Sequence, residues 1–94
     1  MRSYELVFIV PPDAEGDELS AVVDTVEGLV KRVDGTVARV DPWGLRRLAY
    51  PIQGQWEGQY VLMVLEMEPQ SVSELERSLK LNEQVMRHLV VRVD

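Results

Sequence analysis

The chain has 94 residues, 46% hydrophobic and 28% charged, and sixteen acidic against ten basic residues give it a net charge of -6. That length has room for one hydrophobic core, so residues 1–94 are expected to form a single domain. The lack of cysteine excludes disulfides and thiolate chemistry, no apolar run approaches the roughly 20 residues of a spanning helix, and the acidic balance argues against a general nucleic-acid binder.

The first predicted element is a buried strand over Tyr4–Val10, an apolar, β-rich run ended by Pro11-Pro12. Its apolar part is too short for a signal-peptide core, so we expect a soluble cytoplasmic protein with no membrane contact. A helix should follow, with Asp17 as its cap and Gly35 at its stop. Six apolar residues recur between them at helical spacing: Leu19, Val22, Val23, Val26, Val30 and Val33.

Residues 36–52 predict a long strand interrupted at Asp41-Pro42-Trp43-Gly44. Pro51 has no N–H to donate to a ladder, so this strand should lie at a sheet edge. A hairpin loop is expected over Gln53–Gly58, followed by another apolar strand over Tyr60–Met67.

A capping box of Ser71 with Glu74 opens the second predicted helix, which should end near Asn82. A last strand is expected over Met86–Val93. The order β-α-β-β-α-β is that of an α+β, ferredoxin-like fold, in which two helices lie on one face of a four-stranded antiparallel sheet.

The other face of such a sheet is left open by the helices. Strand alternation predicts a covered set of side chains that face the helices: Tyr4, Leu6, Phe8, Leu48, Tyr50, Ile52, Val61, Met63, Leu65 and Val90. It predicts an open set of side chains on the face that the helices leave uncovered: Glu5, Val7, Ile9, Arg47, Ala49, Pro51, Tyr60, Leu62, Val64, Arg87, Leu89 and Val91. An apolar face with a charged rim is typical of a protein interface. The alternative is that strands of small α+β domains are apolar on both faces through propensity alone.

Catalytic constellations are mostly absent, so we expect no enzyme and no cofactor. His88 is the only histidine, which argues against zinc sites and nucleophilic triads and predicts a packed or edge histidine. An acylphosphatase-like hydrolase would need an anion-binding loop after the first strand. The segment from Pro11 to Glu15 is acidic there and would repel phosphate.

Arg46 and Arg47 are neighbours on an acidic chain. Adjacent guanidinium groups repel unless an anion is near, and their forked donors suit phosphate and carboxylate, so the pair predicts an acidic partner. Trp56, in the hairpin loop, could stack on a nucleotide or cover the hairpin's own apolar base. Trp43 is expected to pack at the strand break.

Five sequence motifs run from one end of the chain to the other. They are Met1-Arg2-Ser3-Tyr4-Glu5, Gly44-Leu45-Arg46-Arg47-Leu48-Ala49-Tyr50-Pro51-Ile52, Gly58-Gln59-Tyr60, Leu75-Glu76-Arg77-Ser78-Leu79 and Val85-Met86-Arg87-His88. In these motifs the chain resembles the bacterial ribosomal protein S six family of the small subunit. The resemblance implies a ferredoxin-like fold. It also implies binding to the central domain of small-subunit ribosomal RNA as a heterodimer with ribosomal protein S eighteen.

By that resemblance, four residues occupy the family's basic positions and are assigned to RNA phosphate or to the partner: Arg2, Arg46, Arg47 and Arg87. The expected protein-partner face is Glu5, Val7, Ile9, Ala49, Tyr60, Leu62, Val64, Leu89 and Val91. Tyr4 and Tyr50 also match motif positions, and alternation predicts both in the core.

Two departures from the family qualify these expectations. The loop from Gln53 to Glu57 lacks the basic residues that members often carry, and the sequence stops at Asp94 without the C-terminal extension of many members. Phosphate contacts by basic side chains of the loop, and partner contacts by such a tail, are therefore not expected. The main alternative function is a small ferredoxin-like regulatory or oligomerisation module that pairs through its open sheet and binds a metabolite.

Overall fold

Six main elements follow one another along the chain. A computed structural model describes all of residues 1–94. In it the elements are β1 (Arg2–Val10), α1 (Asp17–Arg32), β2 (Thr36–Ile52), β3 (Gln55–Met67), α2 (Val72–Leu81) and β4 (Arg87–Arg92). A 3₁₀ turn, Pro69–Ser71, precedes α2. Neither helix is long and apolar enough to cross a membrane.

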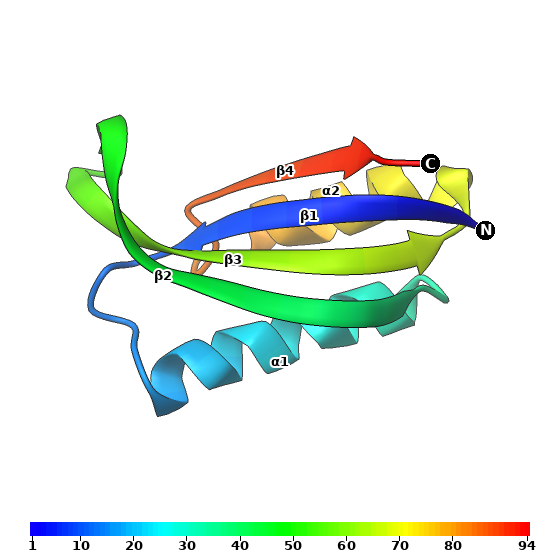
Figure 1. The fold of residues 1–94 in the computed structure, drawn as a ribbon, viewed down its shortest axis with the longest axis horizontal. Helices are drawn as coiled ribbons and strands as arrows, with labels where there is room; N and C mark the ends of the chain where they lie inside the picture. The colour runs from blue at the N-terminus through cyan, green and yellow to red at the C-terminus, as the bar shows by residue number, and fades with distance from the viewer.

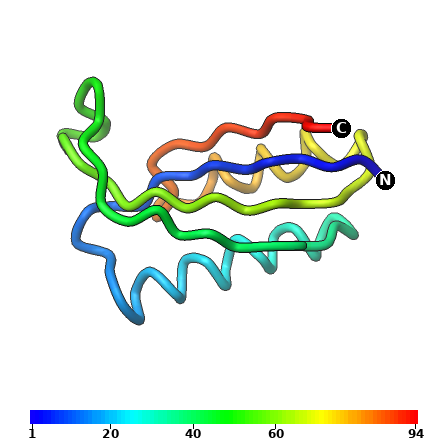
Figure 2. Tube along the Cα trace, viewed as in Figure 1, coloured from blue at the N-terminus to red at the C-terminus, as the bar shows by residue number.

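The four strands form one antiparallel sheet in the spatial order β2-β3-β1-β4, and α1 and α2 lie against the same face (Figure 1). The Cα trace shows both chain termini at one end of the sheet and the β2–β3 hairpin at the other (Figure 2). The predicted ferredoxin-like fold is confirmed, and the strand that carries Pro51 is an edge strand as expected.

The main core fills the space between the sheet and the helices. Alternate residues of β1 and β3 meet there, because directly paired residues point to the same face of a sheet. Helix α1 contributes Val22, Val26 and Val30, and α2 contributes Leu75 and Leu79. Seven residues of the predicted covered set lie in or against this core: Tyr4, Leu6, Phe8, Val61, Met63, Leu65 and Val90.

The two predicted helix caps do not form. Asp17 is the first residue of α1, and Gly16, with φ of 60°, takes the cap position without a side-chain bond. Ser71 does precede α2, but it belongs to the 3₁₀ turn and has helical backbone angles, whereas a capping side chain needs an extended residue. Its Oγ instead donates to the carbonyl of Val33 at 3.1 Å. This bond joins the start of α2 to the end of α1.

Helix α1 ends in a Schellman arrangement, in which Asp34 takes the left-handed conformation expected for glycine. Its φ is 62°, its N–H donates to Lys31 at 3.0 Å, and the N–H of Gly35 donates to Val30 at 2.9 Å. Gly35 serves a different purpose. A Cβ there would lie 2.9 Å from Cγ1 of Val30.

Replacing Asp34 with glycine should therefore stabilise the domain by about 0.5–1 kcal/mol. Glycine adopts a left-handed φ without steric cost, and the substitution also removes an acidic group from the negative end of the helix dipole. Urea unfolding monitored by circular dichroism measures this difference. A loss of stability would show that the Asp34 side chain itself holds the turn.

Strand β2 is continuous but irregular. Its pairing with β3 shifts register between Val37 and Arg39, between Pro42 and Gly44, and again between Arg47 and Ile52. An inserted residue reverses which side chains face the helices, so alternation cannot be carried along this strand from one end to the other. Beyond the second shift, residues 45–58 form a hairpin that extends past the helices; we call it the hairpin arm (Figure 1).

The assignment of Leu48, Tyr50 and Ile52 to the covered face is consequently wrong. Leu48 is buried on the open face, in a second small core with Ile9 and Met86, and Ile52 packs against that core. Tyr50 is not in any core, with 51% of its surface exposed. The register shifts are the physical cause, since they bring the apolar row of the hairpin arm to the side away from the helices.

Candidate functional site

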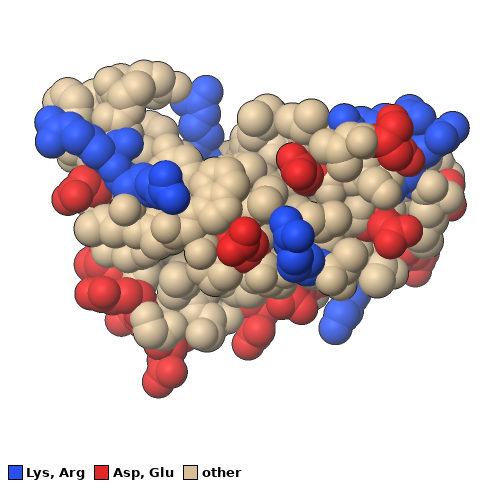
Figure 3. All heavy atoms as spheres, in the orientation of Figure 1, with Lys and Arg blue, Asp and Glu red and all other residues tan.

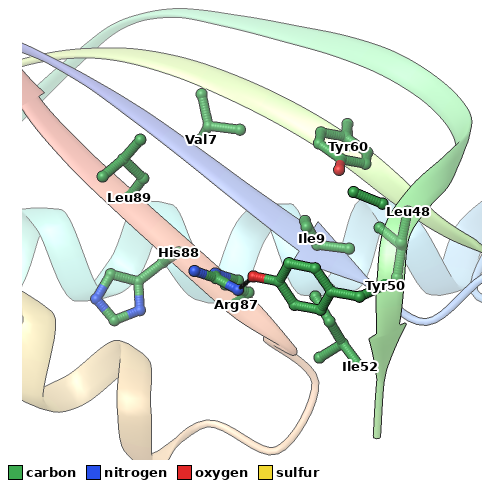
Figure 4. A pocket seen from close by; sticks show the side chains of 10 residues that line it. Val7, Ile9, Leu48, Tyr50, Ile52, Tyr60, Arg87, His88 and Leu89 are labelled. Atoms are coloured by element: carbon green, nitrogen blue, oxygen red, sulfur yellow. Dashed lines mark hydrogen bonds between the residues drawn. The ribbon is translucent and has the colours of Figure 1, made fainter. Parts of the chain in front are cut away.

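An apolar hollow of about 250 Å³ lies on the open face, where the hairpin arm stands opposite the start of β4 (Figure 4). Most of its walls are hydrophobic, and the second small core forms its floor. The lining residues are Val7, Ile9, Leu48, Ala49, Tyr50, Ile52, Tyr60, Arg87, His88 and Leu89.

One polar contact spans the hollow. The guanidinium of Arg87 donates a hydrogen bond to the hydroxyl of Tyr50, and its Cζ lies 5.5 Å from the centroid of the Tyr50 ring. Figure 4 shows these two side chains meeting between β4 and the arm, while the imidazole of His88 points away. Because one donor serves Tyr50, the remaining N–H groups of the exposed Arg87 stay available to an anion.

The rest of the predicted partner face lies in register on the open side. Its members pair directly across β1, β3 and β4: Glu5 with Val64 and Val91, Val7 with Leu62 and Leu89, and Ile9 with Tyr60 and Arg87. Their accessibility differs, because the second core and the arm bury Ile9, and Leu62 is also buried. Leu89 is 61% exposed and is the most accessible large apolar side chain of this set.

Each arginine of the neighbouring pair lies over a tryptophan. The Cζ of Arg46 is 5.7 Å from the Trp43 ring centroid, and that of Arg47 is 5.9 Å from the Trp56 ring centroid. Trp43 in turn stacks on Tyr60, with centroids 6.3 Å apart and planes 13° from parallel. Trp43 does pack, as predicted, but at a register shift within the continuous strand and not at a break, and it remains partly exposed.

The two arginines do occupy alternate rows of the hairpin, but the faces are exchanged relative to the prediction. Arg46 pairs with Gly58, in the row that continues to Tyr60 on the open face. Arg47 pairs with Glu57, in the other row. The register shift next to Gly44 causes this exchange.

Three of the four predicted basic residues, Arg46, Arg47 and Arg87, lie at the arm end of the sheet, whereas Arg2 lies at the end that holds the termini (Figure 1). Near Arg2, the side chain of Arg92 binds Asp94 at 3.2 Å. A backbone hydrogen bond from Ser3 holds the pKa of Asp94 below its usual value, and Arg92 and Arg2 act in the same direction.

Charge is segregated on the surface. In Figure 3, basic side chains gather over the arm and at the end with the termini, and acidic side chains dominate the lower margin along α1. Residues 45–58 contain two arginines and one glutamate in a chain of net charge -6. A segregated surface of this kind can attract an anion locally while the whole protein is acidic.

Two structural contacts that hold the arm were missed by sequence reasoning although they lie in a recognised motif. Gly58 sits against Ile9, and an added Cβ would lie 2.4 Å from Cγ2 of that residue. Gln59 is buried, and its Nε2 donates to the carbonyl of Pro12 at 3.2 Å. Together they fix the base of the arm to β1 and to the turn after it. The only signal in the sequence was the family motif Gly58-Gln59-Tyr60. Neither hydrophobic periodicity nor residue type indicates these two contacts.

Comparison with known proteins gives one consistent result. Residues 3–92 match the family described as Ribosomal protein S6. The chain is 42% identical to Small ribosomal subunit protein bS6 of Moorella thermoacetica over 94 residues, which cover 100% of this chain and 96% of that protein. It is 38% identical to the bS6 of Desulforamulus reducens, over 98% of this chain and 97% of that one.

Solved structures agree. The crystal structure of 30S ribosomal protein S6 from Thermotoga maritima matches with a TM-score of 0.89 and 29% identity, over 98% of this chain and 87% of that one. The P2 domain of the chemotaxis kinase CheA from the same organism has a TM-score of 0.67 at 15% identity, over 98% of each chain, which is a likeness of fold alone.

Proposed function

The chain belongs to the ribosomal protein S6 family, and on that premise we propose that it binds the central domain of small-subunit ribosomal RNA as a heterodimer with ribosomal protein S eighteen. Membership makes the chain a structural protein of the small ribosomal subunit and not an enzyme. Its place is the ribosome, which in bacteria lies in the cytoplasm.

The observation that carries the proposal is the apolar hollow on the open face, which Arg87 borders. Contiguous exposed apolar surface on a small monomer is typical of a protein interface. The floor of the hollow is already packed, with Ile9, Leu48 and Met86 buried together, so docking would order few additional side chains. The accessible Leu89 and the half-buried Val7 supply the contact surface.

The RNA part of the proposal rests on the arginines. Neutralising phosphates releases counterions, so affinity should fall with salt by about 0.9 log units per log unit of salt for each duplex contact. With three basic residues at one end of a chain of net charge -6, the domain alone should bind RNA weakly. A partner seated in the hollow would add affinity and orient the basic surface.

The test is a titration of labelled central-domain RNA with the domain, with the partner, and with both together. Weak binding by the domain alone and much tighter binding by the pair are expected, with co-sedimentation of the domain with small subunits. Equal affinity of the domain alone and of the pair would contradict the cooperative arrangement.

A double variant, Arg46→Ala with Arg47→Ala, separates binding from folding. It should weaken assembly with RNA and partner and reduce the salt dependence, because two phosphate contacts are removed. The free energy of unfolding should fall by only about 1 kcal/mol, since each exposed cation–π contact contributes about 0.5 kcal/mol. A large drop in melting temperature would instead make the pair structural.

The alternative of a metabolite-binding or oligomerising module is less well supported. The hollow of about 250 Å³ is smaller than the roughly 300–1,000 Å³ of most ligand pockets. Antiparallel pairing of β4 with a second copy over its full length would set Arg87 opposite Arg92, and like charges directly opposite are destabilising. A saturable thermal shift with amino acids or nucleotides, together with a stable homodimer, would favour that alternative.

A further inference from the structure

We propose that Trp56 and Arg47 at the hairpin arm form a stacking site for one unpaired RNA base. The inference rests on the proposed function for its RNA, and it assigns a specific ligand chemistry to a residue outside the hollow. Both tryptophans of the chain lie at the hairpin, and each carries an arginine over its ring.

The two tryptophans are not equivalent. One face of Trp43 is occupied by the Tyr60 ring, 6.3 Å away and nearly parallel, and Arg46 lies over the same indole. Trp43 is therefore engaged within the protein. Trp56 has no aromatic neighbour, is 53% exposed, and has Arg47 as its cation–π partner. Trp56 is therefore about half accessible, and no second ring of the protein stacks on it as Tyr60 does on Trp43.

The chemistry of the pair suits a nucleotide. An indole offers a flat surface on which any base can stack, and a neighbouring guanidinium both stacks and binds the phosphate of the same nucleotide. A base within a duplex is already stacked on its neighbours, so the site selects a single-stranded nucleotide. Residues 45–58 carry more positive than negative charge, which favours an anionic ligand. Charge alone does not separate a phosphodiester from an acidic protein surface of equal charge. The exposed indole does, because it favours an anion that carries a planar group.

Position supports the same reading. The arm extends past the helices, so a ligand at Trp56 would not meet α1 or its acidic residues (Figures 1 and 3). The hollow on the open face lies at the base of the arm, between the arm and β4. A protein seated in the hollow and an RNA strand on Trp56 could therefore be bound at the same time.

The experiment uses the Trp43→Phe variant of the full chain, in which Trp56 is the sole tryptophan. At low salt, short single-stranded oligoadenylate should quench its fluorescence saturably, and an RNA duplex of the same length should quench it far less. Trp56→Leu should weaken oligoadenylate binding, measured by anisotropy of a labelled strand, by about tenfold or more, whereas Trp56→Phe should retain most of it. Arg47→Gln should weaken it too, and Arg77→Gln on α2 is the control with the same change of charge.

Each outcome bears on the proposal. Equal affinity of Trp56→Leu and the unaltered chain, equal quenching by duplex, or quenching by the partner protein without RNA would each overturn it. Co-sedimentation with small subunits is measured in parallel. If the chain co-sediments but single strands do not bind, the stacking inference fails and the proposed function stands; if it does not co-sediment, the proposed function fails.

Discussion

Replacing Gly58 with alanine is expected to lower the free energy of unfolding by about 1–3 kcal/mol, the range for an over-packed core. Gly58 is buried where β3 crosses Ile9, and an added Cβ would come within 2.4 Å of Cγ2 of Ile9. That methyl group belongs to a β-branched side chain buried in the second small core, so it cannot swing aside freely. Either β3 or Ile9 must move.

Thermal unfolding measures the effect, since about 1 kcal/mol shifts the midpoint of a domain of this size by roughly 4–8 °C. Gly28→Ala is the matched control. Gly28 lies inside α1, where an added Cβ meets nothing within 4 Å, so that variant should gain about 0.5–1 kcal/mol. Opposite signs for the two substitutions are the expected result. A Gly58→Ala protein that melts like the unaltered chain would contradict the close approach of β3 to β1.

Replacing Leu89 with aspartate is expected to weaken binding of the proposed partner protein by about 100-fold while leaving the fold intact. A buried, unpaired carboxylate at an interface costs several kcal/mol, and central apolar anchors carry most of the binding energy. Leu89 lines the hollow and is 61% exposed in the isolated domain. The folding stability of the domain therefore depends little on that side chain.

Leu81→Asp provides the control for charge and exposure. Leu81 is 76% exposed at the end of α2, in the helix layer, and its replacement should leave partner affinity unchanged. Isothermal titration with the purified partner gives both affinities. If both variants bind as tightly as the unaltered chain, the hollow is not the docking surface.

Much of the fold could be predicted, because the local signals were consistent. The periodicity of Val22, Val26 and Val30, the alternation in β1, and Pro51 at an edge all pointed to the observed arrangement. The helix caps failed because Ser71 and Asp17 are suitable residue types in unsuitable positions, one in a 3₁₀ turn and one already helical. Residue type indicates a cap, but backbone angles decide whether it forms.

The candidate site was harder to predict for a different reason. Bulges in β2 are set by pairing with β3, which no local pattern in the sequence records. Those bulges decide to which face of the sheet the side chains of Leu48 and Arg46 point, and the hollow depends on them as well. The side chains of Val7, Leu89 and Val91 could be placed correctly because β1 and β4 pair without a shift.

The second small core has a consequence for where the domain yields first. Three buried residues, Ile9, Leu48 and Met86, compose it, whereas sixteen compose the core beneath the helices. A segment with so little apolar burial opens at a free energy well below that of global unfolding. We therefore expect the hairpin arm to open more readily than the helix-covered part of the sheet, and this is the end of the molecule that carries most of the proposed binding residues.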